Sequence, residues 1–293
     1  MHTIFFDDKG QIRSGWRIVV FITGYFLAVS LTAAVAFAVF GFSEVVTPVS
    51  LAVNAFIVLI PALVVGSLSG KLLEQLPFSA IGIQFSLRSL KSFVTGSVTG
   101  IATLLFAIAI AMAFGGLSFS WNPAVTNDIW AALGVPLLVF AVAAAAEEAL
   151  FRGYVFQTLT RSGYAWLAIL ITSVPFGLAH LGNPNAGVIS TVNTVLAGVW
   201  FGLAYLKTRD LWFVWGMHWL WNWTQGSIFG IEVSGLTVLT AAPLLIEQDN
   251  GPQWLTGTTY GIEGGIVCTI AIVISMGLIY FLPIIDPCDT RNV

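Results

Sequence analysis

The stretch AAAAEEALFRG, residues 143–153, decides how this chain must fold. It places Glu147, Glu148 and Arg152 at the end of an apolar run, because no charged residue occurs from 130 to 146. A charged side chain near the centre of a bilayer costs about 2.5 to 3.5 kcal/mol on insertion scales. Three such side chains in one membrane segment therefore need mutual pairing, water or a catalytic role to be stable there.

The composition of the whole chain is that of a membrane protein. Of 293 residues, 57% are hydrophobic and 9% are charged, and the mean hydropathy is +0.92. These values predict an all-α polytopic membrane protein that forms a single domain over residues 1–293. The net charge of −3 comes from few ionisable groups, so we expect no nucleic-acid partner. Two cysteines are too few for a disulfide framework.

Runs of about 20 residues without charge predict about eight transmembrane helices. We place them at 18–40, 49–69, 92–114, from 129 onward, 166–181, 186–206, 211–230 and 264–282. Apart from Arg152, the Lys and Arg residues all fall on one side of this map. The loops on the opposite side contain acidic residues but no Lys or Arg. Because short cytoplasmic loops collect basic residues, both termini are predicted to be cytoplasmic and 231–263 to be an extracytoplasmic loop. The first apolar run is long enough for a retained span and too long for a cleaved signal.

The two adjacent glutamates are predicted to have different roles. Neighbouring side chains on a helix diverge by about 100°, so Glu147 and Glu148 cannot face one cavity equally. Glu148 and Arg152 have the i,i+4 spacing and order that favour a helix ion pair. We therefore predict that Glu148 pairs with Arg152 and that Glu147 is the free carboxylate.

Two histidines fall inside apolar spans, which is unusual in a membrane protein. His180 follows Phe176 by one helical turn, and His218 precedes Asn222 by one turn. The residues after the glutamate motif contain no helix-ending proline, so we predict that this helix continues to Thr160. Glu147 and His180 then both lie about 20 Å from the cytoplasmic ends of their helices. We expect these polar side chains to line one cavity that faces the cytoplasm.

Such a set of side chains has the chemistry needed for amide hydrolysis. A carboxylate beside an imidazole can hold and deprotonate a water molecule. A second imidazole with a nearby amide can donate hydrogen bonds to the oxyanion that forms on attack. Glu147, His180 and His218 also suit a His2Glu zinc site of the kind found in metalloproteases, although the H-E-x-x-H spacing is absent. The sequence thus leaves open a cofactor-free site or a zinc site.

Three motifs in this order resemble those of the CPBP family of intramembrane proteases, which includes the CAAX prenyl protease 2 type and bacteriocin-processing or Abi-like relatives. The motifs are Glu147-Glu148-x-x-x-Arg152, Phe176-x-x-x-His180 and His218-x-x-x-Asn222. The resemblance covers about 129–229 and implies an α-helical core, predicted here at 129–230, with a cavity open to the cytosol. Carried over by position, it implies that Glu147 and His180 activate water and that His218 and Asn222 form the oxyanion site. The ion pair of the first motif would support the fold.

We therefore predict an intramembrane endopeptidase of a prokaryotic plasma (inner) membrane. Its expected partners are membrane lipids and a peptide or membrane-anchored protein substrate. Two other classes fit buried ionisable residues. A transporter or channel would use them as an ion or proton path, although the chain has no internal repeat of the motif. A non-catalytic immunity or scaffold protein would keep the fold without the chemistry.

Overall fold

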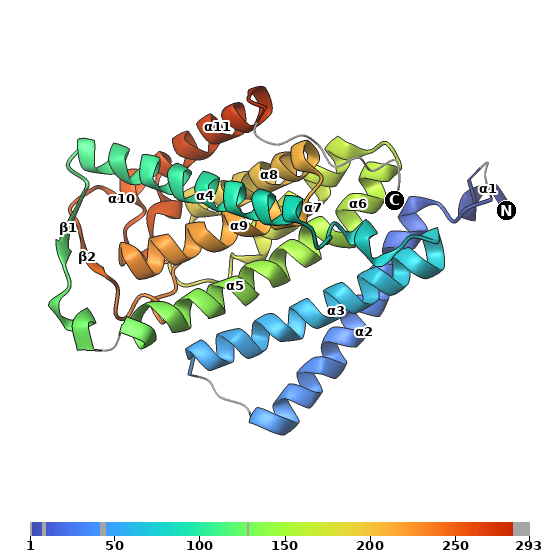
Figure 1. The fold of residues 1–293 in the computed structure, drawn as a ribbon, viewed down its shortest axis with the longest axis horizontal. Helices are drawn as coiled ribbons and strands as arrows, with labels where there is room; N and C mark the ends of the chain where they lie inside the picture. Colours follow the sequence, from blue (N-terminus) through green and yellow to red (C-terminus); the bar gives the residue numbers. More distant parts are fainter. Residues whose placement is uncertain (1, 8–9, 42–44, 128, 284–293) are drawn as a thin grey trace.

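The computed structural model describes residues 2–7, 10–41, 45–127 and 129–283. It is almost entirely α-helical, so the predicted fold class is confirmed (Figure 1). Each predicted span falls on a helical segment, although within 211–230 the α-helix ends at Trp223 and continues as the π-helical turn η5 (Thr224–Ile228). These segments are α2 (Ser14–Phe40), α3 (Pro48–Glu74), α4 (Leu87–Ala113), α5 (Val135–Glu148) with α6 (Tyr154–Arg161), α7 (Ala165–Ala179), α8 (Val188–Thr208), α9 (Leu211–Trp223) and α11 (Ile266–Phe281).

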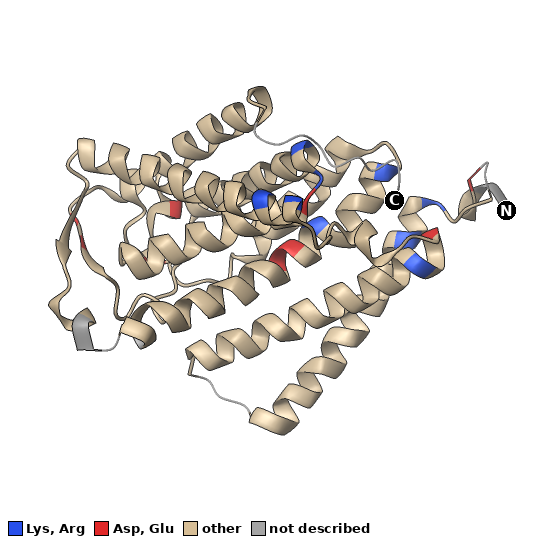
Figure 2. Cartoon of the chain, in the orientation of Figure 1, with Lys and Arg blue, Asp and Glu red and all other residues tan. Residues whose placement is uncertain are grey.

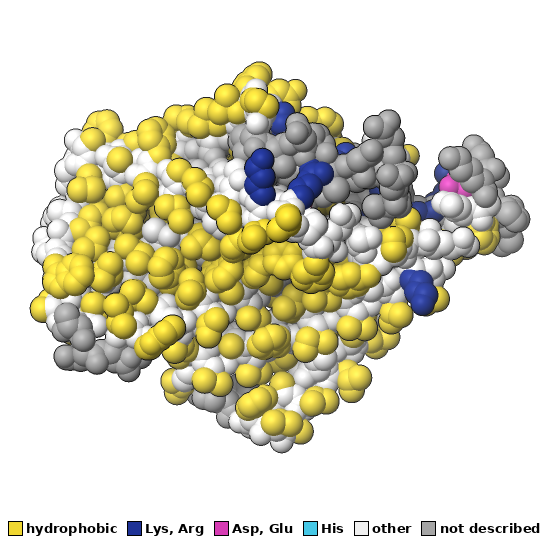
Figure 3. All heavy atoms as spheres, viewed as in Figure 1, with side chains coloured by type: hydrophobic (Ala, Val, Ile, Leu, Met, Phe, Trp, Pro, Cys, Tyr) yellow, Lys and Arg dark blue, Asp and Glu magenta, His cyan; other side chains and the backbone are white. Residues whose placement is uncertain are grey.

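Five of these segments are long and apolar enough to cross a membrane: α2, α3, α4, α8 and the continuous segment Ala132–Arg161. The apolar helices α7 and α11 are shorter. Hydrophobic side chains cover most of the face of the bundle seen in Figure 3, as expected where lipid replaces water around the protein. The predicted number of eight spans stays a prediction.

Basic residues lie toward one end of the bundle. The blue Lys and Arg segments run from the middle of the view to the end where α2 begins and α3 finishes, whereas the two-stranded sheet lies at the opposite end (Figures 1 and 2). This one-sided distribution agrees with the pattern from which the cytoplasmic side was predicted. The location of the termini is not tested by the fold and stays a prediction.

The helix that carries the glutamate motif continues past Arg152, as predicted. Only with this continuation do Glu147 and His180 lie at similar distances from the cytoplasmic ends of their helices. Between α5 and α6 the chain forms the π-helical turn η4 (Ala149–Gly153), so the segment is helical as far as Arg161 but not uniformly α-helical. A second π-helical turn, η3 (Trp130–Gly134), precedes α5. Short π-helical turns inside α-helices are often found at functional sites.

A stripe of tryptophans fastens α9 to α5. Trp215, Trp219 and Trp223 lie four residues apart on one face of α9 or at its end. Their indole N–H groups donate to the carbonyl oxygens of Ala141, Leu137 and Leu133, at 2.8, 2.9 and 3.0 Å respectively. These bonds satisfy indole donors that would otherwise be costly to bury away from water. They also fix how α9 is rotated against α5.

The opposite contact of α9, with α4, is made through glycines. A Cβ at Gly96 or Gly100 would collide with the carbonyl oxygen of Phe213 or Met217, and one at Gly216 would collide with that of Phe93. Small residues allow two helix backbones to approach closely in a membrane, where packing supplies much of the stability. The helix that carries His218 is therefore held on two sides.

The segment 231–263 is an ordered part of the structure. Its strand β2 (Leu245–Asp249) pairs antiparallel with β1 (Leu117–Trp121), with Phe119 opposite Glu247. The short helices α10 (Gln253–Thr256), η6 (Thr258–Tyr260) and η7 (Ile262–Gly264) follow, and Ile231 and Ile262 are completely buried. Sequence patterns indicated only a loop here, because the pairing partner of β2 lies far away along the chain.

The stability of this sheet should depend on pH through Glu247. Burial, together with the charges of Glu232 and Asp249, raises the pKa of Glu247 to about 8, from an ordinary value of 4.5. The folded protein therefore binds this proton more tightly than the unfolded chain, and stability falls as pH rises from about 4.5 to about 8. We expect Glu247→Gln to flatten this dependence and to raise the thermal midpoint near pH 8.

The measurement is thermal unfolding of the purified, detergent-solubilised protein across this pH range. Gln248→Ser lies on the exposed face of the same strand and serves as the control, which should follow the wild-type pH dependence. An unchanged pH profile in Glu247→Gln would contradict the assignment.

Candidate active site

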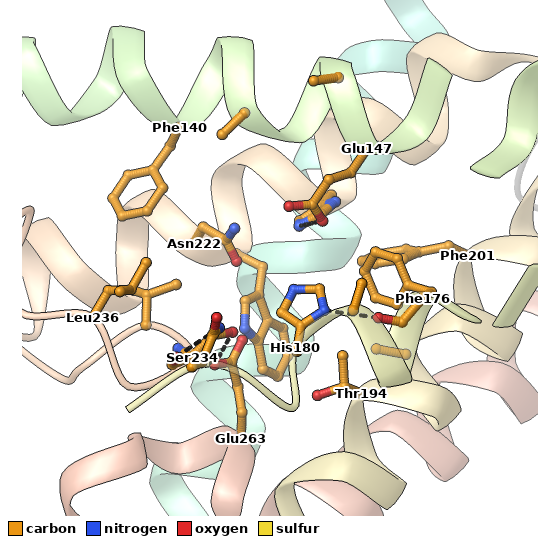
Figure 4. A pocket seen from close by; sticks show the side chains of 18 of the residues that line it. Phe140, Glu147, Phe176, His180, Thr194, Phe201, Asn222, Ser234, Leu236 and Glu263 are labelled. Carbon is orange, nitrogen blue, oxygen red and sulfur yellow. Dashed lines mark hydrogen bonds and ion pairs between the residues drawn. The ribbon is translucent and has the colours of Figure 1, made fainter. Parts of the chain in front are cut away.

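The predicted site residues meet at one cavity of about 420 Å³. It lies among α3, α5, α7, α8, α9, α11 and the segment 231–263, and its wall includes Glu147, His180, His218 and Asn222. Figure 4 shows the carboxylate of Glu147, the ring of His180 and the amide of Asn222 directed toward the same space. The structure thus brings together the four residues that the sequence proposed as catalytic.

The ion pair between Glu148 and Arg152 is present and completely buried. Arg152 Nη1 lies 3.2 Å from Glu148 Oε1, and both side chains have 0% exposure. Arg152 Nη2 also donates to the carbonyl oxygen of Gly198 at 3.0 Å. Its guanidinium lies 4.7 Å from the ring centre of Phe176 and 5.1 Å from that of Phe201. A charge, a backbone acceptor and two aromatic faces therefore compensate for burial of this cation.

Glu148 has a second partner that the sequence analysis missed. Its Oε1 lies 2.8 Å from His218 Nδ1. An ionised carboxylate only accepts hydrogen bonds, so Nδ1 carries the proton and donates it. The ring of His218 also stacks on Phe201, with centres 4.9 Å apart. His218 is therefore held by a buried ion pair on one side and an aromatic ring on its face.

Helix geometry explains why His218 and Asn222 face the cavity. Each immediately precedes a tryptophan of the stripe on α9, so their side chains lie about 100° round the helix from the face that contacts α5. His218 Nε2 points toward Glu147, with 3.8 Å between Nε2 and Oε2. The half-buried Asn222 lies one turn farther along the cavity wall.

Glu147 is the more accessible of the two glutamates, as predicted. Its side chain is 32% exposed, against 0% for Glu148. Its Oε2 is buried and makes no hydrogen bond with the described part of the chain. The side chain as a whole is partly exposed at the cavity wall, where a carboxylate is able to bind a water molecule or a substrate group.

His180 lies at the C-cap of α7, where the last helical carbonyl groups lack intrahelical partners. Its Nδ1 lies 2.8 Å from the carbonyl oxygen of Phe176. Because a carbonyl oxygen only accepts, Nδ1 is the protonated nitrogen and Nε2 keeps its lone pair. The Phe176 ring also contacts the rings of both histidines, with centres 5.0 Å from His180 and 6.1 Å from His218. Phe176 thus sets the orientation and tautomer of one catalytic candidate and packs against the other.

With this geometry established, the chain can be compared with known protein families. Residues 130–224 match the family model described as "Rce1-like: Type II CAAX prenyl endopeptidase Rce1-like". The predicted family resemblance is confirmed over this region. All three motifs lie within it, and at the level of the family the match supports an endopeptidase. No curated protein matches the chain. No solved structure matches it either.

The zinc alternative gains no support from the donor geometry. Among the residues that the structure describes, no group of three or more His, Cys, Asp or Glu side chains is arranged to hold a metal ion. His218 Nδ1 is hydrogen-bonded to Glu148, whereas Nε2 faces Glu147 across 3.8 Å. The described side chains therefore do not by themselves form a His2Glu metal centre.

The segment 231–263 contributes a further carboxylate that the sequence analysis did not single out. Glu263 lines the cavity, and its Oε2 accepts from Ser234 N at 2.6 Å and from Ser234 Oγ at 3.0 Å. Asn183 Nδ2 donates to the carbonyl oxygen of Ser234 at 3.0 Å. Burial raises the pKa of Glu263 above its ordinary range. The sequence signal that could have identified Glu263 was an acidic residue directly before an apolar run. Its burial could not be predicted, because it depends on how 231–263 packs over the cavity.

Removing Arg152 should destabilise the protein severely. Arg152→Met would leave Glu148 buried without its cation, a change that typically costs about 3 to 5 kcal/mol. We expect a large fall in the thermal midpoint in detergent. The double variant Glu148→Gln/Arg152→Met removes both charges and should recover a substantial part of that loss, because the introduced glutamine amide can still accept from His218. Equal midpoints for wild type and Arg152→Met would show that the pair is not formed.

Proposed function

We propose that this chain is an intramembrane endopeptidase that hydrolyses a peptide bond of a membrane-associated protein or peptide. The single observation that carries this proposal is the convergence of Glu147, His180, His218 and Asn222 on one cavity. That cavity is built largely from the region that matches the endopeptidase family model.

In the proposed reaction, Glu147 and His180 bind and activate the attacking water. The unused acceptor of Glu147 and the Nε2 lone pair of His180 each accept a hydrogen bond from it. Glu147 takes a proton as the water oxygen bonds to the substrate carbonyl carbon. When the C–N bond breaks, Glu147 returns this proton to the leaving amine nitrogen. The carboxylate is regenerated, and no external proton is needed.

His218 and Asn222 are proposed to stabilise the oxyanion. Asn222 supplies amide N–H donors at the cavity wall. His218 donates Nδ1–H to Glu148, so a second proton on Nε2 makes it a donor to the cavity as well. Glu148 and Glu147, 2.8 and 3.8 Å from its two ring nitrogens, provide the negative charges that suit an imidazolium. Fixed donors in a water-poor cavity stabilise a developing negative charge more strongly than water does.

The proposed substrate is an apolar or lipid-associated peptide. Much of the cavity wall is aliphatic or aromatic, including Val139, Phe140, Leu150 and Phe201. The printed family description names CAAX prenyl endopeptidases, so a prenylated carboxyl-terminal peptide is the first substrate to test. We also propose that 129–230 is the catalytic core, that the cavity is reached from the cytoplasm, and that 231–263 covers its outer end in a prokaryotic plasma membrane.

Replacing either water-activating residue should abolish peptide cleavage. We expect Glu147→Gln and His180→Ala each to lower kcat by at least about 10²-fold, since each removes a group that acts on the water. The measurement is turnover of a fluorogenic prenylated peptide by the purified protein. Glu247→Gln, which is not among the residues that line the cavity, is the control and should retain wild-type turnover near neutral pH.

Wild-type turnover in both active-site variants would contradict the proposal. If no variant and no wild-type sample cleaves any peptide, while proteoliposome ion flux is lost in Glu147→Gln, a transporter would replace the protease as the better interpretation.

The oxyanion role gives a separate prediction for Asn222. Asn222→Ala should lower kcat by about 10²- to 10³-fold, the effect of losing one oxyanion donor, with little change in KM. Asn222→Asp has a similar size but replaces the amide donor with a carboxylate, and should be at least as defective. A rise in KM with unchanged kcat in Asn222→Ala would instead assign this residue to substrate binding.

A further inference from the structure

We propose that a second pocket, between the start of α2, the end of α3 and α6, binds the phosphate of an anionic lipid head group. This pocket has a volume of about 520 Å³ and shares no lining residue with the cavity that holds Glu147. The start of α2 and the end of α3, which help to line it, lie at the basic end of the bundle (Figure 2). Its lining consists of Asp7, Gln11, Arg13, Ser14, Arg17, Glu74, Leu76, Arg161, Ser162 and Tyr164.

The charges in the lining favour an anion. The described residues of the lining carry three guanidinium groups, on Arg13, Arg17 and Arg161, and two carboxylates, on Asp7 and Glu74. Glu74 is 5% exposed and pairs with both Arg17, at 3.0 Å, and Arg161, at 3.2 Å. One carboxylate therefore holds two guanidinium groups side by side and cannot neutralise both. The fixed guanidinium groups are suited to the geometry of a phosphate group.

Arg17 has a donor that nothing in the described structure satisfies. The residue is 6% exposed, Nη1 donates to Glu74, and Nη2 donates to Gln11 Oε1 at 3.1 Å. Its Nε is buried and has no hydrogen-bond partner among the described residues. Buried guanidinium N–H groups are nearly always satisfied, so a donor left over in a pocket wall indicates an acceptor from outside the chain.

The beginning of α2 adds a second attractive feature. Ser14 starts a helix of 27 residues, and in the described structure no side chain caps it. The first N–H groups of a helix lack intrahelical acceptors and carry partial positive charge, which favours a bound anion. A Cβ at Gly15 would meet no atom within 4 Å, so the first turn is open on that side.

The surroundings favour a lipid as the source of the phosphate. Ile4, Phe5, Trp16, Val19 and Val20 all expose 40% or more of their surface close to the pocket in sequence, and the rings of Phe5 and Trp16 lie 4.9 Å apart. Aromatic and aliphatic side chains next to basic ones are typical of the membrane interface. Basic pockets between membrane helices bind anionic head groups, with a contribution from each Lys or Arg. Free phosphate from solution offers the same chemistry without the acyl chains.

The test is native mass spectrometry of the detergent-solubilised full chain, titrated with phosphatidylglycerol, phosphatidylcholine or inorganic phosphate. We expect phosphatidylglycerol to bind more tightly than phosphatidylcholine. The exposed Arg13→Gln should weaken phosphatidylglycerol binding about fivefold, the effect of one basic residue near a membrane surface. Lys91→Gln removes an equal charge from an exposed position outside the pocket and should leave binding unchanged.

Each outcome decides the proposal. Weaker lipid binding in Arg13→Gln alone, with no competition from inorganic phosphate, supports the lipid head group. Competition by inorganic phosphate, again lost in Arg13→Gln, supports the anion site and assigns its ligand to solution. Equal affinity for the two lipids, or equal effects of Arg13→Gln and Lys91→Gln, overturns the proposal.

Discussion

The buried contact of Arg152 with Glu148 is the constraint on which the rest of the structure depends. Neither charge reaches solvent, so the fold has to supply every compensating group itself. It does so with His218 from α9, the Gly198 carbonyl from α8 and the ring of Phe176 from α7. Three consecutive helices, α7, α8 and α9, are thus oriented around one pair of charges. The same groups place both histidines around the cavity.

This arrangement gives the two adjacent glutamates different surroundings. Glu148 is satisfied by Arg152 and His218, whereas its neighbour Glu147 keeps an unused acceptor at the cavity wall. One turn of helix therefore carries one carboxylate that is held by two partners and another that borders the cavity. The division follows from the 100° between adjacent side chains and would be lost if the two residues were moved apart by a full turn.

Much of this organisation could be predicted from the sequence. Apolar runs located the long apolar helices because hydrophobic length is a strong signal, and the i,i+4 spacing identified the Glu148–Arg152 pair. The bond from Glu148 to His218 could not be predicted, since it joins residues from separate helices and competes with a local pairing that already explained Glu148. The β1–β2 sheet and the cavity-lining position of Glu263 were missed for the same reason. Both depend on tertiary packing, and no local pattern encodes them.

The glycines of α4 have a consequence that extends beyond packing. Gly96 and Gly100 lie outside the region 130–224 that matches the family model, yet they meet the backbone of the helix that carries His218. Sequence changes in the amino-terminal half of the chain are therefore constrained at Gly96 and Gly100. Relatives whose first hundred residues look unrelated should still keep small side chains at these two positions. A fragment cut to the matched region would lack the surface of α4 that holds the helix with His218 in place.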